Sequence, residues 1–355
     1  MKKTVFIRFH KAFPIIIFIL FSLAIINNPG AAISGARNGL VFTGETVIPC
    51  LFPFTVGGIF LYKSGGIFRL SQIFDRFSRP ILKLSGKEFA IFLLSLIGGY
   101  PMGAKLIGEM KRQGEITTRR AQFLLTFCVN ASPTFFISAI GVGIFSSKTI
   151  GLILFIANIL SSITCIYIFY KFSGKDLRLK SNHNTSFCFG DSLVLSVKET
   201  SEIFLNISGF IVLFSTLNSL VGEIITSRLL KLVLGIMFEV TTACNMASKD
   251  NLAVYFYSFI ISFGGLSTIF QILTCLSECS ISFAYLFLTR VFQGLFSSFY
   301  TYILFKLFPV LMPTYATHKN LIIANATPSI STLSLLVLGI LYLIYINRCF
   351  LRKNT

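Results

Sequence analysis

Long apolar runs, separated by short clusters of Lys and Arg, set the pattern along this chain. Residues 13–26, 150–169, 283–308 and 330–346 are the clearest runs. They approach or reach the roughly 20 residues that a helix needs to cross about 30 Å of hydrocarbon. The pattern therefore predicts an all-α polytopic membrane protein with about seven to nine transmembrane helices.

The basic clusters predict which side of the membrane each loop occupies. Lys2, Lys3 and Arg8 precede the first apolar run, so the N-terminus is expected in the cytoplasm. Residues 1–36 resemble a secretory signal but serve equally as an uncleaved first span, and we expect a retained N-terminal transmembrane anchor. Residues 63–87 are strongly basic and should be cytoplasmic, with an amphipathic helix along the interface at 67–84.

Residues 88–110 form an apolar segment with basic clusters on both sides. A simple crossing would leave one of these clusters outside, against the usual bias. The middle reads GGYPMG, which is poor material for a continuous helix. We therefore expect a re-entrant hairpin that enters from the cytoplasm, turns near Tyr100 and returns.

The remaining segments suggest that the second half repeats the first. Residues 121–145 should cross outward with a break at Asn130, Ser132 and Pro133, and 150–172 should cross back to a polar cytoplasmic linker at 173–192. Residues 252–273 then resemble 88–110, and 194–217 resemble 40–61. Residues 251–289 contain no Lys or Arg, and Glu278 is expected at their turn, so the second broken segment should enter from outside.

This arrangement predicts two inverted-topology repeats, each with a broken or re-entrant helix. The first repeat is expected at 37–172, the second at 193–308, and a C-terminal loop and transmembrane helix at 309–355. The alternative is that apolar residues and glycines coincide by chance. Residues 283–308 are expected to cross inward, so a further crossing at 330–346 would leave Arg348, Arg352 and Lys353 outside, against the bias.

Composition agrees with this reading and excludes other classes of protein. The chain is 54% hydrophobic and 12% charged, with a mean hydropathy of +0.80, and a soluble fold does not hide that much apolar surface. The net charge of +18 is dispersed among apolar runs, which argues against nucleic-acid binding. The sequence contains no catalytic constellation and no metal-ligand spacing, so we expect neither an enzyme nor a cofactor.

Broken helices give the first set of candidate binding residues. Unpaired backbone survives in lipid only where it is packed in protein or lines a polar cavity, and a half-helix presents its positive end there. The alternative is that these residues merely allow close helix packing. The candidate substrate-binding residues of the breaks are Gly98, Gly99, Tyr100, Pro101, Gly103, Asn130, Ser132, Pro133, Gly264 and Gly265.

Polar side chains inside the spans give the second set. Glu239 lies in FEVTTACN, where Thr241 and Asn245 add polar groups, although Glu239 is also compatible with a place near the outer interface. Lys105 is expected to reach the cytoplasmic headgroups. Glu109 and Glu115 are expected in a solvated loop, and Gln271 and Gln293 are expected to hydrogen-bond across helices.

Two motifs carry a family resemblance. IGGYPMGAKL from Ile97, followed by FCVNASPTFFISAIGVGIF from Phe127, resembles the sporulation integral membrane proteins of the YlbJ type, within the nucleoside-recognition or Gate-domain group. FEVTTACN, SFGGLS and LTRVFQGL follow in the family's order, so the resemblance covers most of 39–308. FEVTTACN departs from the group's Glu-Ile-Thr-Asn-Gly run, because its Asn is displaced and its Gly is absent.

The resemblance implies a role in spore development in a Gram-positive host. With the predicted repeats, it leads us to expect a transporter-like protein of the cell membrane in which two halves enclose a site for an unknown small polar solute. Membrane lipid would be its surroundings. The alternative is a non-transporting assembly protein that binds other sporulation membrane proteins or a second copy of itself.

Overall fold

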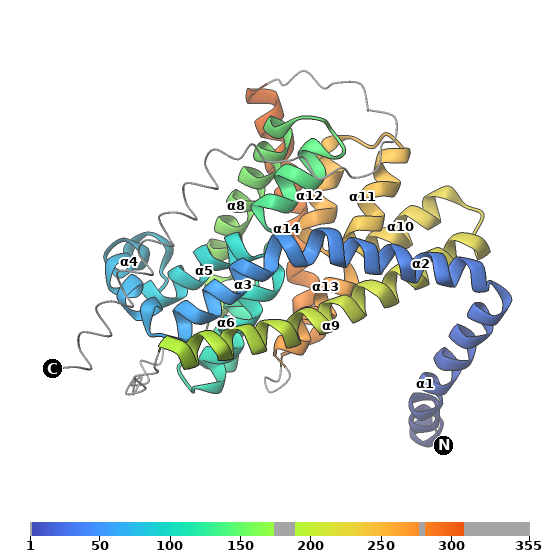
Figure 1. The fold of residues 1–355 in the computed structure, drawn as a ribbon, viewed down its shortest axis with the longest axis horizontal. Helices are drawn as coiled ribbons and strands as arrows, with labels where there is room; N and C mark the ends of the chain where they lie inside the picture. Colours follow the sequence, from blue (N-terminus) through green and yellow to red (C-terminus); the bar gives the residue numbers. More distant parts are fainter. Residues whose placement is uncertain (1, 174–188, 277–280, 309–355) are drawn as a thin grey trace. The chain divides into compact units, whose positions relative to one another are not determined.

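The computed structural model describes residues 2–173, 189–276 and 281–308, and these residues form helices and connecting segments with no strand (Figure 1). In the first half the helices are α1 (Lys2–Asn27), α2 (Pro29–Phe42), the π-helical η1 (Thr43–Val47), α3 (Ile48–Lys63), α4 (Gly66–Leu82), α5 (Gly86–Gly98), α6 (Tyr100–Arg112), α7 (Thr118–Leu125), the π-helical η2 (Phe135–Val142), α8 (Lys148–Phe169) and the 3₁₀ turn η3 (Tyr170–Phe172). The second half has α9 (Phe189–Ile224), α10 (Arg228–Phe238), α11 (Val240–Lys249), α12 (Val254–Phe263), α13 (Gly265–Cys275) and α14 (Phe283–Leu307).

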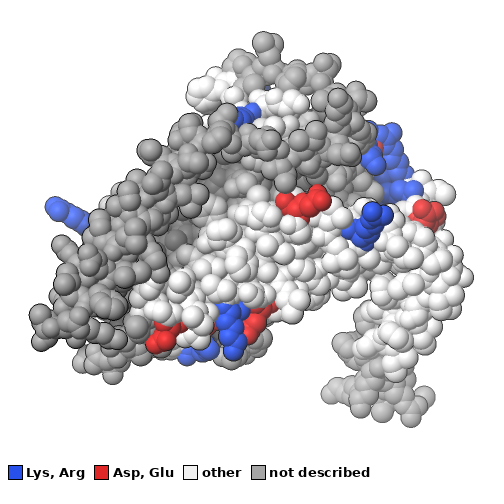
Figure 2. Space-filling model, viewed as in Figure 1, with Lys and Arg blue, Asp and Glu red and all other residues white. Residues whose placement is uncertain are grey.

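Within the described residues, four continuous or bent helices are long and apolar enough to cross a membrane: Pro29–Lys63, Lys148–Phe169, Phe189–Ile224 and Val254–Cys275. Large apolar side chains face outward on these helices, as Leu205 shows with 76% exposure. Figure 2 shows the same feature as broad uncharged areas, with one group of charges near the first half of α9 and another toward the right of the view. Lipid is the solvent that suits such a surface. The prediction of an all-α polytopic membrane protein is confirmed.

Contacts between distant segments define two ends of the helical assembly. We call the end that holds Lys63 the basic end, and the opposite end the far end. At the basic end, the Lys63 end of α3 lies beside the start of α9, where the Phe60 and Phe189 rings are in edge contact. The α9 helix then runs antiparallel to α2, whose Gly35 approaches the Ser215 backbone. The far end therefore holds the start of α2 and the end of α9.

The first hairpin forms as the sequence predicts. Ser85 starts α5 with a capping box that includes Glu88, and α6 starts just after Gly99, which adopts φ +80°. The Lys87 ammonium at the start of the first arm lies 2.6 Å from the Glu115 carboxylate after the second arm, which shows that the two arms fold back on each other. Both ends of the hairpin therefore lie at the basic end, and its tip lies near Tyr100. The amphipathic helix expected at 67–84 is α4, which packs against α5.

The second hairpin lies at a different place in the chain from the one that the sequence predicts. α10 and α11 fold back on each other at Glu239, and Arg228 at the start of α10 forms an ion pair with Asp250 after α11. Residues 252–273 are expected from the sequence to be the re-entrant counterpart of 88–110, but the helix Val254–Cys275 that contains most of them bends without reversing and is long and apolar enough to cross a membrane. Val254 packs in a cluster with Phe145 at the far end, whereas Cys275 lies against Gly108 of α6.

This misplacement has a physical reason. Gly264 and Gly265 both have positive φ, but here they bend a helix without reversing it. The reversal at Glu239 needs no glycine, because the Glu239 side chain caps α11 by accepting hydrogen bonds from the amides of Thr241 and Thr242. The predicted turn at Glu278 lies outside the described residues.

The direction expected for residues 283–308 is also wrong. The start of α14 packs at the basic end, where the Tyr285 and Phe169 rings are in edge contact, and Ser298 further along reaches the Tyr255 carbonyl of α12. α14 therefore runs from the basic end to the far end. The expected crossing at 330–346 and the C-terminal segment 309–355 lie outside the described residues, as does most of the linker expected at 173–192.

The described elements follow the same order twice. Each half has a long helix, then a hairpin, then an interrupted helix, then a second long helix. In the first half these are α2 to α3, α5 with α6, α7 with η2, and α8. In the second half they are α9, α10 with α11, α12 with α13, and α14. The boundary expected between residues 36 and 37 falls within α2.

Candidate functional site

The tip of the first hairpin rests directly on the break that follows it. Helix α7 ends at Leu125, and the chain stays non-helical through Asn130 and Ser132. Gly103 in the first turns of α6 packs so closely here that a Cβ atom on it would lie 1.7 Å from the Cys128 carbonyl oxygen. Only a glycine allows this contact, so Gly103 fixes the position of the hairpin tip against the break.

The second hairpin packs in the same way. A Cβ on Gly265 would lie 3.1 Å from the Phe238 carbonyl oxygen and 3.2 Å from the Glu239 nitrogen. Glu239 is only 2% exposed, and it accepts hydrogen bonds from the hydroxyls as well as the amides of Thr241 and Thr242. A carboxylate at the start of a helix is stabilised by the helix dipole. Glu239 is therefore a buried, fully hydrogen-bonded cap.

The two hairpin tips meet in one region. The Tyr100 hydroxyl at the first tip donates a hydrogen bond to the Ile261 carbonyl, three residues before Gly264. The Tyr100 ring also packs on a buried cluster that contains Ala131 of the first break and Val240 and Ala243 of the second hairpin. Both hairpin tips and both breaks thus converge.

A buried polar network, centred on Asn130, lies at this convergence. The Asn130 Oδ1 atom accepts hydrogen bonds from Asn158 (3.1 Å), Ser162 (2.9 Å) and Gln293 (2.9 Å). The Ser262 hydroxyl on α12 donates to Asn158 Oδ1 at 3.0 Å. None of these five side chains is more than 2% exposed. The network joins the first break, α8, α12 and α14, and Gln293 Oε1 has no hydrogen-bond partner in it.

Arg290 places a positive charge beside this network. Its side chain is 0% exposed and donates hydrogen bonds to the carbonyls of Val129 and Thr126. These carbonyls lie after the end of α7, where a broken helix leaves acceptors without partners, and a cation is favourable there. The Arg290 Nε atom has no hydrogen-bond partner, and no carboxylate forms an ion pair with Arg290 among the described residues.

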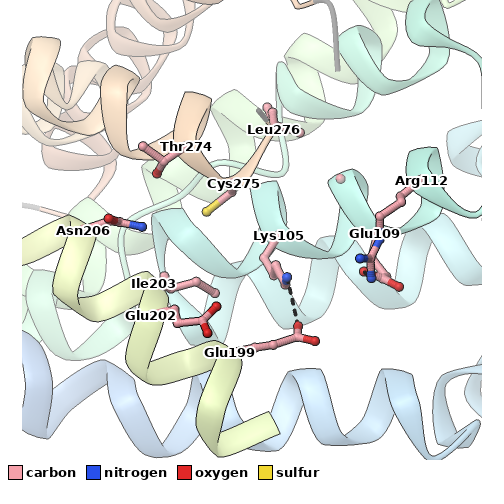
Figure 3. Close-up of a pocket in the computed structure, with 11 residues that line it drawn as sticks. Lys105, Glu109, Arg112, Glu199, Glu202, Ile203, Asn206, Thr274, Cys275 and Leu276 are labelled. Atoms are coloured by element: carbon pink, nitrogen blue, oxygen red, sulfur yellow. Dashed lines mark hydrogen bonds and ion pairs between the residues drawn. The ribbon is translucent and has the colours of Figure 1, made fainter. Parts of the chain in front are cut away.

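A second polar feature lies nearer the basic end, between α6, α9 and the end of α13. This pocket of about 170 Å³ is lined by Lys105, Glu109, Arg112, Glu199 and Glu202 together with uncharged residues (Figure 3). Lys105 lies 2.9 Å from Glu199, and the same carboxylate lies 2.7 Å from Lys63 of α3. Glu199 therefore ties α9 to α3 and to the first hairpin.

Two expectations for charged residues are corrected at this end. Lys105 pairs with Glu199, and its expected reach to the headgroups stays a prediction. Glu109 and Glu115 are not in a solvated loop, because their side chains are about 9% exposed and pair with Arg112 (2.5 Å) and Lys87 (2.6 Å). Burial lowers the pKa of Lys87 below its ordinary value, and the Glu115 carboxylate opposes that shift.

The structure brings most of the predicted residues together, with one exception. Pro101 lies in the first turn of α6, close in sequence to Gly98 and Gly99. The Ser132 hydroxyl accepts a hydrogen bond from the Phe135 amide at the start of η2, and Pro133 follows Ser132. Asn245 is exposed on α11 and does not join the residues around Glu239. Gln293 does bond across helices, as predicted, whereas the Gln271 amide donates to the Ser267 hydroxyl within α13.

Sequence reasoning missed Asn158, Ser162, Ser262 and the role of Arg290. A signal was present, because polar residues recur on one face of α14 at helical spacing: Arg290, Gln293, Ser297 and Thr301. Ser297 and Thr301 continue the polar contacts by bonding to Ser258 of α12. In the part of the chain that the structure describes, no three His, Cys, Asp or Glu residues are grouped to hold a metal ion.

The fold and this site define an all-helical, multi-spanning membrane protein with a buried polar centre. No protein-family model matches the chain, and no solved structure matches it. It is 24% identical to the sporulation integral membrane protein YlbJ of Bacillus subtilis (strain 168), over 81% of each chain. This similarity supports a YlbJ-type assignment and a membrane protein involved in sporulation.

Proposed function

We propose that this protein is a transporter-like membrane protein that acts in sporulation and binds a small polar solute where its broken helices meet. The name of its relative supports the biological setting. The observation that carries the proposal is the convergence of two hairpin tips and two helix breaks on the Asn130 network. The proposed mechanism is alternating access, in which hairpins and broken helices open the site to one side at a time.

The energetics of the network support a binding role. A membrane protein gains nothing from hiding polar side chains between apolar helices unless they bind each other or a ligand. Asn130 bonds within the network, but Gln293 Oε1 and Arg290 Nε stay unpartnered although both side chains are fully buried. A solute that reached this point would find a hydrogen-bond donor and an acceptor on adjacent turns of α14.

The two repeats are proposed to have inverted topology. The mouth of the first hairpin lies at the basic end, and the Arg228–Asp250 mouth of the second follows the end of α9 at the far end. With the basic end in the cytoplasm, the N-terminus would be cytoplasmic and the second hairpin would enter from outside the cell membrane.

Side-specific labelling tests this topology. In a variant whose native cysteines other than the buried Cys128, Cys165 and Cys244 are replaced by serine, we expect Arg228→Cys to react with a membrane-impermeant maleimide in intact cells. Arg79→Cys on α4 and Gln113→Cys after α6 should react only after the membrane is opened. All three positions are exposed, so access to the side chain does not decide the outcome. Equal labelling of all three in intact cells would contradict the inversion.

A flux measurement tests the transport proposal. Purified protein is placed in vesicles loaded with a metabolite extract, and mass spectrometry identifies the solutes that the wild type moves. We expect Asn130→Ala to slow their flux by roughly tenfold or more, because Asn158, Ser162 and Gln293 each lose a buried acceptor. Asn38→Ala, at an exposed position on α2, is the matched control and should leave flux unchanged.

The second candidate is a non-transporting assembly protein, which we do not take to be an enzyme. The observation in its favour is that the centre is closed, with Asn130 only 1% exposed. Under this alternative the wild type would move no solute, and it would purify with a stoichiometric membrane partner or as a homo-oligomer. Flux that depends on Asn130 would exclude it.

A further inference from the structure

We infer that α4 is a binding surface for anionic phospholipid headgroups of the membrane leaflet at the basic end, and that the guanidinium groups of Arg69 and Arg76 receive them. Three observations lead to this partner. They are the position of α4 at the ends of two long helices, the lack of carboxylates for its arginines, and an apolar stripe beside them. The inference goes beyond the proposed function and does not depend on transport.

Both ends of α4 are fixed at the ends of helices that are long and apolar enough to cross a membrane. The helix starts at Gly66, directly after Lys63 ends the apolar helix Pro29–Lys63. Near its other end, the Ile81 carbonyl accepts a hydrogen bond of 2.8 Å from the hydroxyl of Tyr167, in the last turn of α8. A helix held at these two points lies in the interface between hydrocarbon and water, where tyrosine is also enriched.

Arg69 and Arg76 have no carboxylate partner within the described part of the protein. Both side chains are exposed, and among the described residues neither forms an ion pair. The one carboxylate on α4, Asp75, already pairs with Arg79 at 2.6 Å and accepts a hydrogen bond from the Gly86 amide at 2.7 Å. Other basic side chains at this end pair with carboxylates of the protein: Lys63, Lys87, Lys105, Arg112 and Arg120. A guanidinium binds phosphate oxygens through paired N–H donors, so these two arginines are free to receive headgroups.

An apolar stripe runs beside these arginines on the outer surface of α4. Ile73, Phe77 and Ile81 are 67%, 40% and 58% exposed, and their spacing of four residues places them on one face of the helix. Ile73 lies four residues after Arg69 and three before Arg76, so it is a neighbour of both on the helix surface. The stripe enters the acyl region while the arginines reach the phosphates, which is how amphipathic helices bind anionic membranes.

The first hairpin holds α4 in place. Gly86 at the start of α5 packs so closely on α4 that a Cβ atom on it would lie 1.9 Å from the Ser71 carbonyl oxygen. The Ser78 hydroxyl donates a hydrogen bond to the Leu84 carbonyl at 3.0 Å. A peptide that folds on a membrane loses conformational entropy when it binds, whereas α4 is already ordered. The arginines are therefore presented to the headgroups without that cost.

Brominated lipids test the inference, because the chain contains no Trp and a single introduced tryptophan reports the lipid beside it. Ile73→Trp places the reporter between the two arginines, and Phe299→Trp, 57% exposed on α14, is the matched control. The full chain is placed in phosphatidylcholine nanodiscs that contain an increasing fraction of phosphatidylglycerol or phosphatidylcholine with brominated acyl chains, which quench tryptophan on contact. We expect brominated phosphatidylglycerol to half-quench Ile73→Trp at a mole fraction about threefold lower than brominated phosphatidylcholine. The two lipids should quench Phe299→Trp equally.

Further variants assign that preference to the arginines. In the Ile73→Trp protein, Arg69→Gln with Arg76→Gln should remove the preference, whereas Arg69→Lys with Arg76→Lys should keep most of it because the charge is retained. Lys148→Gln with Lys249→Gln makes the same change in net charge at exposed positions of the far end and should leave the preference unchanged. With both arginines present, raising the ionic strength from about 0.05 M to about 1 M should bring the two lipids to nearly equal quenching.

Three results would overturn the inference: equal quenching of Ile73→Trp by the two brominated lipids, a preference of the same size at Phe299→Trp, or a preference that survives the double glutamine substitution. If that double variant does not fold, a preference that survives high salt overturns the inference instead. Equal quenching would point to an acidic protein segment as the partner of α4. Solute flux enters none of these measurements, so the transport proposal stands or falls separately.

Discussion

Gly103→Ala is expected to destabilise the protein more than any other substitution by alanine at a glycine of the hairpins. The added methyl group would lie 1.7 Å from the Cys128 carbonyl oxygen and 2.9 Å from the Ser95 Cβ, and neither is the flexible end of a side chain. The tip of α6 would have to move away from the break by more than an ångström. Overpacking of this kind costs about 3 kcal/mol, which predicts a drop in the thermal midpoint of roughly 5–10 °C.

The control for this prediction is Gly57→Ala on α3. Gly57 also lies within a helix, but it is exposed and a Cβ there meets no atom within 4 Å. Alanine should be neutral or slightly stabilising at Gly57, because alanine favours helix. The thermal midpoints of both variants are measured with a thiol-reactive fluorogenic dye, because Cys128, Cys165 and Cys244 are buried and react on unfolding. A Gly103→Ala protein with the stability of Gly57→Ala would mean that the hairpin tip does not rest on the Cys128 carbonyl.

Gly103→Ala should also change flux if the proposed function holds, since the tip carries Tyr100 toward Ile261 and the Asn130 network. A displacement of the tip would separate the first hairpin from α12. We expect flux to fall in the folded fraction of the variant, whereas Gly57→Ala should transport like the wild type. Stability and flux would then report the same contact.

The first half of the fold was predictable because its signals are local. Basic residues on both sides of residues 88–110 and the glycines between them point to a chain reversal, and the structure has one at Gly99. Asn130, Ser132 and Pro133 interrupt a span, and α7 stops before them. Each of these features depends on residues that are close in sequence, so a single chain reveals it.

The second half was less predictable because its reversal depends on a side chain. Glu239 turns the chain by capping α11, and Asp250 meets Arg228 across the mouth of the hairpin. Neither feature has the composition of a turn. The glycine pair at 264–265 carries that composition, yet it only bends a crossing helix. A glycine shows that the backbone is free to change direction, but packing decides by how much.

Of the residues in the polar centre, Asn130 was predictable from the sequence and its partners were not. Asn130 lies in a visible break, whereas Asn158 and Gln293 lie in regular helices whose facing surfaces only the tertiary packing defines. A polar residue in a span indicates that some partner exists, but it does not identify the partner. The spacing of polar residues on α14 predicts which face of this helix makes polar contacts, and the structure shows that α8 and α12 pack against that face.

Arg120→Met is expected to have the second large effect, at the mouth of the first hairpin. Arg120 at the start of α7 and Glu88 at the start of α5 form a bidentate ion pair, with N–O distances of 2.6 and 2.7 Å. Their side chains are 3% and 1% exposed. Removing Arg120 leaves the Glu88 carboxylate buried without its partner, which costs about 3–5 kcal/mol.

The double variant Glu88→Gln with Arg120→Met separates this electrostatic cost from lost packing. Glutamine keeps the acceptor that the Ser85 amide uses in the capping box, and it carries no charge to leave unpaired. The double variant should therefore recover about half or more of the stability lost in Arg120→Met, as buried pairs do when both charges are removed together. Arg228→Met, which breaks an exposed ion pair, should change the midpoint little.

The outcome bears on the hairpin itself, because Glu88 and Arg120 are 32 residues apart and meet only if α5 and α6 fold back on each other. If 88–110 crossed the membrane once, the two charges would face opposite leaflets and their substitutions would be additive. Recovery in the double variant requires that they touch. Simple additivity would remove the hairpin and, with it, the contact between Gly103 and the first break on which the polar centre depends.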